Sequence, residues 1–151
     1  MSRRMATTPV HEVMTASPVT VRPGLGLLEL IALFDRHDFN AFPVVSDQGA
    51  LLGLVTKLDV LRALRPDAAL RIPDSDTLAT VRVTDLMRRG ILSVEAEDPV
   101  AAAADLLVET RLHSLPVVRR RGGAPMLVGM VSRGDLVRGL RFELLEPAKS
   151  H

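Results

Sequence analysis

The sequence repeats itself, and this repetition constrains the fold more than any other feature. Three stretches of the first half align with three of the second: residues 10–14 with 83–87, residues 40–45 with 113–118, and residues 53–59 with 129–135. The offset changes from 73 to 76 positions at a short insertion near residues 122–126. Such self-similarity indicates two copies of one supersecondary unit.

Each copy is predicted to contain a strand, a helix, two strands and a second helix, in that order. Short apolar strands are expected at residues 19–21 and 92–94. In the first copy, Leu27, Leu30 and Phe34 then recur at the spacing of one helical face. A Gly-containing turn separates the next two strands in both copies, which is typical of a hairpin.

We therefore predict an α/β (α+β) fold built from two tandem copies. A copy of about sixty residues buries only a small core, so the two copies are expected to pack against each other. The predicted boundaries are residues 8–65 for the first copy, 66–80 for a linker, 81–142 for the second copy and 143–151 for a C-terminal tail.

Composition excludes several classes of function. The chain has no cysteine, which removes disulfides, thiolate metal sites and cysteine nucleophiles. A net charge of +1 and an aromatic content of 3% are not typical of a nucleic-acid binder. No apolar run reaches the roughly 18 residues of a membrane span, and the N-terminus lacks the apolar segment of a secretory signal. We expect a cytoplasmic protein with no membrane partner.

The pattern Ser/Thr-x-x-Asp follows a predicted strand and opens a predicted helix in both copies. It is typical of a capping box, in which the hydroxyl and the carboxylate each accept a backbone N–H. A helix N-terminus also attracts anions, and a carboxylate one turn further on can accept hydrogen bonds from a ribose. The residues concerned are Thr56, Lys57 and Asp59 in the first copy and Ser132, Arg133 and Asp135 in the second.

A purely structural role for these residues stays open, because capping boxes begin many helices that bind nothing. Two boxes at equivalent positions favour a site, although repetition alone requires only a repeated fold. No histidine is placed to complete a catalytic triad, and the four histidines lack the spacing of a zinc site. The sequence therefore indicates no catalytic residue, no metal site and no required cofactor.

The chain resembles a pair of CBS domains, also called a Bateman module, over residues 8–65 and 81–142. The resemblance is carried by residues 13–15 and 86–87, by the Phe-Pro-Val-Val and Leu-Pro-Val-Val stretches at residues 42–45 and 115–118, and by the two Gly-x-Val-Thr/Ser-x-x-Asp ends. The second copy departs from the pattern at Arg88, where the first has Thr15, and at Gly134.

The resemblance implies a compact pseudo-twofold pair with two clefts between the repeats. Family members bind AMP, ADP, ATP or S-adenosylmethionine there and commonly form homodimers. The chain resembles the stand-alone members, which act on a partner or sense a metabolite alone, and it is therefore expected to be a regulatory module rather than an enzyme. Thr56 and Ser132 match the position that contacts phosphate or ribose, and Asp59 and Asp135 match the ribose-binding carboxylate.

The resemblance also implies contacts to adenine from the ends of the strands. The matching positions are Thr20, Val21, Asn40, Ala41, Phe42 and Pro43 in the first copy, and Ser93, Val94, His113, Ser114, Leu115 and Pro116 in the second. His113 aligns with Asn40, and an ordinary surface histidine is as consistent with the sequence as a ligand contact.

Two other functions remain open. The first is a structural or dimerisation module whose clefts stay empty. The second, less favoured, is a nucleic-acid binder that uses the arginines of residues 119–121, which are more simply explained as a solvated hairpin tip.

Overall fold

The computed structural model describes residues 7–65 and 73–145, so the predicted linker and tail lie partly outside the described residues. The described chain forms two compact units. The middle unit contains residues 19–65 and 73–91, and the terminal unit contains residues 7–18 and 92–145.

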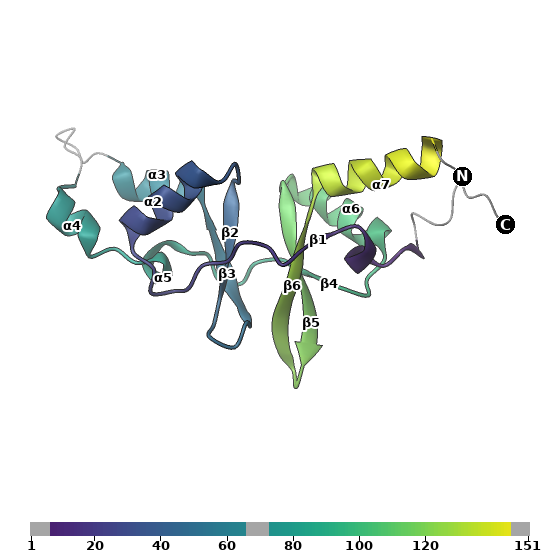
Figure 1. Cartoon of the computed structure of the whole chain (residues 1–151), viewed down its shortest axis with the longest axis horizontal. Coiled ribbons are helices and arrows are strands. Elements are labelled where there is room, and N and C mark those ends of the chain that lie inside the picture. Colours follow the sequence, from purple (N-terminus) through teal and green to yellow (C-terminus); the bar gives the residue numbers. More distant parts are fainter. Residues whose placement is uncertain (1–6, 66–72, 146–151) are drawn as a thin grey trace. The chain divides into compact units, whose positions relative to one another are not determined.

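In both copies a helix, two strands and a second helix follow one another as predicted, and in the second copy a short strand at residues 94–95 precedes them (Figure 1). The elements are η1 (Val10–Glu12), β1 (Thr15–Ala16), α2 (Leu27–Arg36), β2 (Ala41–Val45), β3 (Leu51–Thr56), α3 (Lys57–Leu64), α4 (Ser75–Ala79), α5 (Val83–Leu86), β4 (Val94–Glu95), α6 (Val100–Thr110), β5 (Ser114–Arg121), β6 (Ala124–Ser132) and α7 (Arg133–Leu145). Helix α4 lies within the stretch predicted as a linker, and α7 extends into the stretch predicted as a tail.

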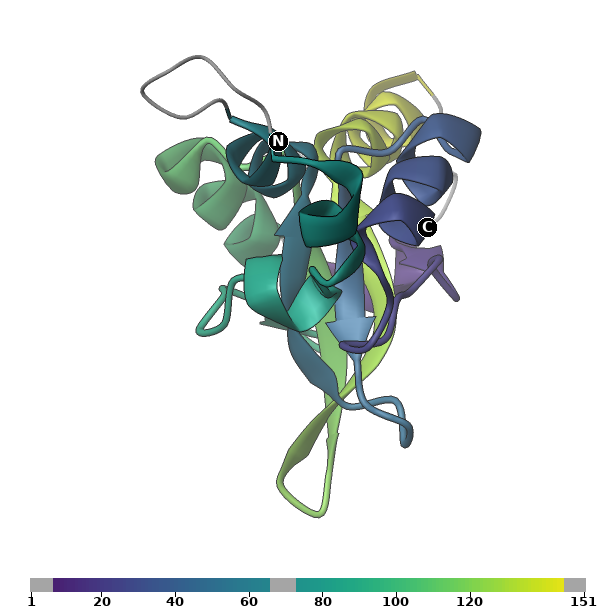
Figure 2. The same ribbon diagram turned by 90° about the vertical axis from the view of Figure 1, so that its left-hand side faces the viewer.

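The middle unit is built on the antiparallel hairpin β2–β3. Figure 2 looks onto this unit, with α4 and α5 in the foreground. Leu27 and Leu30 of α2 are buried with Phe42 and Val44 of β2, as the helical spacing of the apolar residues predicts. The core of this unit therefore lies between the hairpin and its helices.

The strand expected at residues 19–21 is reduced to one isolated bridge, in which Val21 pairs in parallel with Val44. Pro18 and Pro23 flank this bridge. Because proline has no N–H to donate, the ladder cannot continue past these residues. The prediction of a three-residue strand was wrong here.

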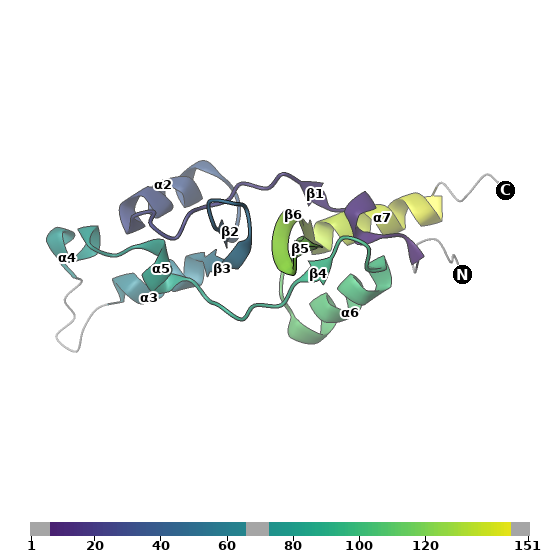
Figure 3. The ribbon, with the colours of Figure 1, turned by 90° about the horizontal axis from the view of Figure 1, so that it is seen from below.

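The terminal unit contains a four-stranded sheet in the order β1-β6-β5-β4. The short strand β4 pairs in parallel with β5, where Val94 faces Val117, and β5 pairs antiparallel with β6. In Figures 1 and 3, α6 and α7 lie on the same side of the β5–β6 hairpin. The core between them contains Val100, Ala103 and Leu107 of α6.

The leading segments of the two copies, residues 8–16 and 81–89, are exchanged. Val10 is buried in the core of the terminal unit, and its N–H donates to Asp98 O at 2.8 Å. Val83 is buried in the core of the middle unit, and its N–H donates to Leu25 O at 2.8 Å. Each core is thus completed by a segment that the sequence repeat assigns to the other copy.

Two glycines allow the leading segments to approach the sheets. Thr15 pairs with Met130 of β6, and Arg88 pairs with Leu54 of β3. Beside these bridges, a Cβ on Gly129 would lie 2.8 Å from Thr15 O, and a Cβ on Gly53 would collide with Arg88 O. The glycine of each Gly-x-Val end is therefore required by the close approach of a neighbouring backbone.

We expect Gly53→Ala and Gly129→Ala each to lower the free energy of unfolding by about 1–3 kcal/mol, because the added methyl group has no space beside the leading segment. Gly24→Ala is the matched control, since a Cβ there meets nothing within 4 Å. Denaturant titration of the three variants measures the difference. Equal stability of Gly53→Ala and Gly24→Ala would contradict this account of the leading segments.

Candidate functional site

The two Ser/Thr-x-x-Asp stretches form the predicted capping boxes. In the middle unit, Asp59 N donates to Thr56 Oγ1 at 3.1 Å, and Thr56 N donates to Asp59 Oδ2 at 2.9 Å. In the terminal unit, Asp135 N donates to Ser132 Oγ at 3.1 Å, and Ser132 N donates to Asp135 Oδ2 at 2.9 Å. Both helices α3 and α7 therefore begin directly after a strand, with a carboxylate fixed in the first turn.

The two carboxylates are buried although they carry charge. Asp59 is 4% exposed and Asp135 is 5% exposed, and they are the two buried charged residues among those whose burial the structure describes. A buried charge is costly unless it is hydrogen-bonded and paired. The partners of these two side chains therefore decide what else can bind to them.

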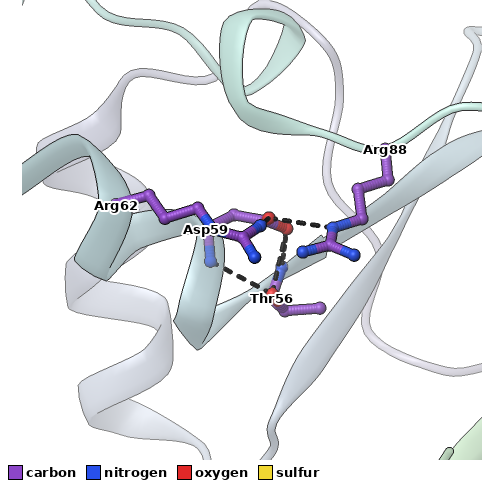
Figure 4. Close-up of polar contacts among 4 residues, drawn as sticks. All are labelled: Thr56, Asp59, Arg62 and Arg88. Atoms are coloured by element: carbon purple, nitrogen blue, oxygen red, sulfur yellow. Dashed lines mark hydrogen bonds and ion pairs between the residues drawn. The ribbon is translucent and has the colours of Figure 1, made fainter.

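Asp59 is held by donors from β3, from α3 and from a leading segment (Figure 4). Thr56 Oγ1 donates to its Oδ2 at 2.9 Å. Its Oδ1 accepts from Arg62 Nη1 of α3 at 3.4 Å and from Arg88 Nε of the leading segment at 3.2 Å. Asp59 thus lies in a cationic environment formed by two guanidinium groups that remain about half exposed.

Asp135 has an equivalent but less cationic environment. Its Oδ1 accepts from Arg138 Nη2 of α7 and, at 3.4 Å, from Thr15 Oγ1 of the other leading segment. Thr15 and Arg88 occupy equivalent positions in the repeat. Each carboxylate therefore contacts the same position of a leading segment, through a hydroxyl in one unit and through a guanidinium in the other.

The helix N-termini are partly occupied by the protein itself. Lys57 N donates to Asn40 O at 3.0 Å, and Arg133 N donates to His113 O at 3.0 Å. With the amides of Asp59 and Asp135 bonded to the capping hydroxyls, two of the first three N–H groups of each helix have a partner. Less of each helix end remains for a phosphate than the sequence alone indicates.

The predicted cations at the two helix starts also differ. The Arg133 guanidinium donates to Leu112 O at 2.9 Å and to Arg111 O, so it binds the end of α6. Lys57 is exposed, and its Nζ lies 6.0 Å from the centre of the Phe34 ring. The side chain of Arg133 is therefore bound to backbone carbonyls just after α6, whereas the side chain of Lys57 lies at the surface of the middle unit.

Within each unit, the predicted strand-end residues lie beside the capping box. Ala41 pairs with Thr56, and Ser114 pairs with Ser132. Asn40 and His113 are exposed next to these pairs. Thr20 precedes the bridge at Val21, Ser93 precedes β4, and both are accessible. The other predicted strand residues are buried; these are Val21, Phe42, Pro43, Val94, Leu115 and Pro116.

Sequence reasoning missed the residues that hold the carboxylates. Arg62 and Arg138 lie three positions after Asp59 and Asp135, and this helical spacing is itself a signal for an ion pair. Arg88 and Thr15 carry no comparable local signal, because they reach the carboxylates only through the exchange of the leading segments.

The basic run at residues 119–121 lies at the tip of the β5–β6 hairpin, where Gly122 and Gly123 have positive φ angles. Arg119 Nη2 lies 3.1 Å from Glu97 Oε2, and Arg120 Nε lies 3.6 Å from Glu95 Oε2. These glutamates neutralise part of the positive charge that would attract the phosphates of a nucleic acid.

Neither a metal site nor a membrane span is found in the described part of the chain. Residues 7–65 and 73–145 hold no group of three His, Asp or Glu side chains that could bind a metal ion. No helix within these residues is long and apolar enough to cross a bilayer.

Comparison with known proteins connects this geometry to a family. The profile of the CBS domain matches residues 10–66 and 83–141. A CBS domain-containing protein of Dictyostelium discoideum is 30% identical over 141 residues, covering 91% of this chain and 94% of that protein. Inosine-5'-monophosphate dehydrogenase of Mycobacterium tuberculosis is 30% identical over 125 residues, which are 83% of this chain but 21% of the enzyme.

Solved structures show the same fold. The structure of CBSX2 from Arabidopsis thaliana, at 28% identity, superposes with a TM-score of 0.75 over 93% of this chain and 98% of that one. A structure of CBSX2 in complex with AMP, also at 28% identity, gives a TM-score of 0.71 over 87% of this chain and 95% of that one.

We expect Thr56→Ala and Ser132→Ala each to lower the free energy of unfolding by about 1 kcal/mol, because each removes the side-chain acceptor at a helix N-cap. Thr56→Ser and Ser132→Thr keep the acceptor and serve as controls that should stay close to the wild type. Urea denaturation followed by circular dichroism measures the four variants. The assignment of the caps is wrong if the alanine and hydroxyl variants unfold at the same urea concentration.

Proposed function

Because the chain belongs to the CBS domain family, we propose that it is a regulatory module that binds an adenosine-containing ligand and is not itself an enzyme. The observation that carries the proposal is the pair of buried carboxylates, Asp59 and Asp135, each set beside a capping hydroxyl where a strand meets a helix. The complex of CBSX2 with AMP supports this ligand class. The proposed ligands are AMP, ADP, ATP or S-adenosylmethionine.

The chemistry of each position suits one part of such a ligand. A carboxylate can accept hydrogen bonds from both hydroxyls of a ribose, which is how acidic residues bind ribose in dinucleotide folds. Thr56 and Ser132 offer hydroxyls at the same place. The exposed Lys57, together with the half-exposed guanidinium group of Arg62, attracts phosphate at the middle unit.

Adenine would be bound at the strand ends next to these groups. Because Phe42 and Leu115 are fully buried in the two cores, their part in the site is to fix the backbone of the strand. We assign the direct contacts to the accessible positions, Asn40 and Thr20 in the middle unit and His113 and Ser93 in the terminal unit.

A regulatory role without catalysis fits the relatives. The dehydrogenase matches this chain over about a fifth of its own length, so the shared part is a module of a larger enzyme. We propose that ligand binding changes how the module contacts a regulated protein, and that this takes place in the cytoplasm.

We further propose that the module forms a homodimer. Leu58 and Leu61 of α3 are 51% and 63% exposed, and Val137 of α7 is 65% exposed. Exposed apolar side chains on helices are suited to an interface between copies of the chain. Analytical ultracentrifugation should give twice the monomer mass, and a monomer at all concentrations would contradict this part of the proposal.

Calorimetric titration tests the ligand class directly. We expect at least one of the four adenosine compounds to bind, and we expect the variant Asp59→Asn, Asp135→Asn to bind it at least about tenfold more weakly, because the amide cannot replace a charged acceptor. Asp85→Asn is the matched control. It alters a carboxylate that likewise accepts the backbone N–H three residues before it, from Arg82 N at 2.8 Å at the start of α5, outside the proposed site.

Two outcomes would change the conclusion. If no adenosine compound binds at millimolar concentration, a structural or dimerisation module becomes the better interpretation. If the double variant binds as tightly as the Asp85→Asn control, the ribose is bound by other residues.

A further inference from the structure

The two carboxylates of the proposed sites differ in the residue that reaches them from the leading segment. Thr15 and Arg88 are equivalent in the repeat, and both belong to an antiparallel bridge beside a required glycine. The first contributes an uncharged hydroxyl to Asp135, and the second contributes a guanidinium to Asp59. The backbone geometry is thus the same, whereas the charge beside the carboxylate is not.

The acceptor capacity of Asp59 is already filled. An ionised carboxylate offers about four lone-pair positions on its two oxygens. Oδ2 accepts from the amide and the hydroxyl of Thr56, both at 2.9 Å, and Oδ1 accepts from Arg62 at 3.4 Å and Arg88 at 3.2 Å. A ribose that donates two hydroxyls to Asp59 must therefore displace a donor that is already bound.

Asp135 is less fully engaged by the described residues. Its Oδ2 accepts from Ser132 N at 2.9 Å, and the Ser132 hydroxyl acts as an acceptor from Asp135 N. Its Oδ1 accepts from Thr15 at 3.4 Å and from the single guanidinium of Arg138, whose side chain is 67% exposed. A diol can therefore reach Asp135 at the open position of Oδ2 and by displacing the uncharged Thr15 hydroxyl, while Arg138 stays bound.

We infer that Arg88 makes the two proposed sites unequal, because it occupies Asp59 as an internal cation that an adenosine ligand must displace. The ligand consequently fills the Asp135 site at lower concentration than the Asp59 site. Arg88 is a specificity-determining residue in this sense, and the inference rests on the proposed function. Its side chain is 49% exposed, so the displaced guanidinium can turn into solvent without a change of the backbone.

The affinities of the two proposed sites for AMP can be measured separately in variants that disable one site each. Asp135→Asn leaves the Asp59 site. In this variant, adding Arg88→Thr should strengthen AMP binding by about two- to fivefold, the range expected for removal of a partly exposed ion pair. Asp59→Asn leaves the Asp135 site, and adding Thr15→Arg should weaken binding by a similar factor. Each substitution places the residue that the other copy has at the equivalent position, which the backbone there accommodates.

Arg89→Thr is the matched control in the Asp135→Asn background. It removes the same charge from the adjacent position, where Arg89 Nη2 donates to Thr84 Oγ1 at 3.2 Å instead of to Asp59. We expect it to leave AMP binding unchanged or slightly weakened. If Arg88→Thr raises the affinity for AMP and Arg89→Thr does not, the cause is the contact of Arg88 with Asp59 and not the change in net charge.

The results distinguish this inference from the proposed function. If AMP binds in the Asp135→Asn background and Arg88→Thr leaves the affinity unchanged or lowers it, Arg88 does not oppose the ligand and this inference alone is wrong. If none of the four adenosine compounds binds to any variant, including Arg88→Thr, both are wrong. Thermal unfolding of each variant without ligand checks that the fold is retained.

Discussion

The docking of each leading segment onto the sheet of the other copy is the contact on which the rest of the structure depends. Gly53 and Gly129 have no side chain, and this allows the backbones at Arg88 and Thr15 to pair with β3 and β6. The same docking buries Val83 and Val10 in the two cores. Packing and the chemistry of the candidate site are therefore set by one contact, repeated twice.

The buried carboxylates show how this contact reaches the site. A capping box by itself would leave the second oxygen of Asp59 or Asp135 to water or to a side chain of the same helix. The leading segment adds a further donor, so each carboxylate is fixed by two segments that are distant in the sequence. An acceptor held in this way is already ordered, so a ligand of the proposed class would lose less conformational entropy in the protein on binding.

Local features were predicted from the sequence, and non-local ones were not. The helix at residues 27–36, the hairpin turn at Gly122 and Gly123 and both capping boxes depend on residues a few positions apart, so their patterns are visible in the printed sequence. The exchange of the leading segments is not visible, because Val10 and Val83 have the same apolar character whichever core they enter. The partners Arg88 and Thr15 follow from that exchange and were missed for the same reason.

Because the leading segments are exchanged, the boundaries of the sequence repeat do not coincide with the boundaries of the two compact units. A break between residues 65 and 73 would give two fragments, each with one complete copy of the repeat. The first fragment would contain β3 without residues 81–89, and the second would contain β6 without residues 8–16. Neither fragment would carry all the parts of its own core, so a single copy is a unit of sequence but not an autonomous unit of folding.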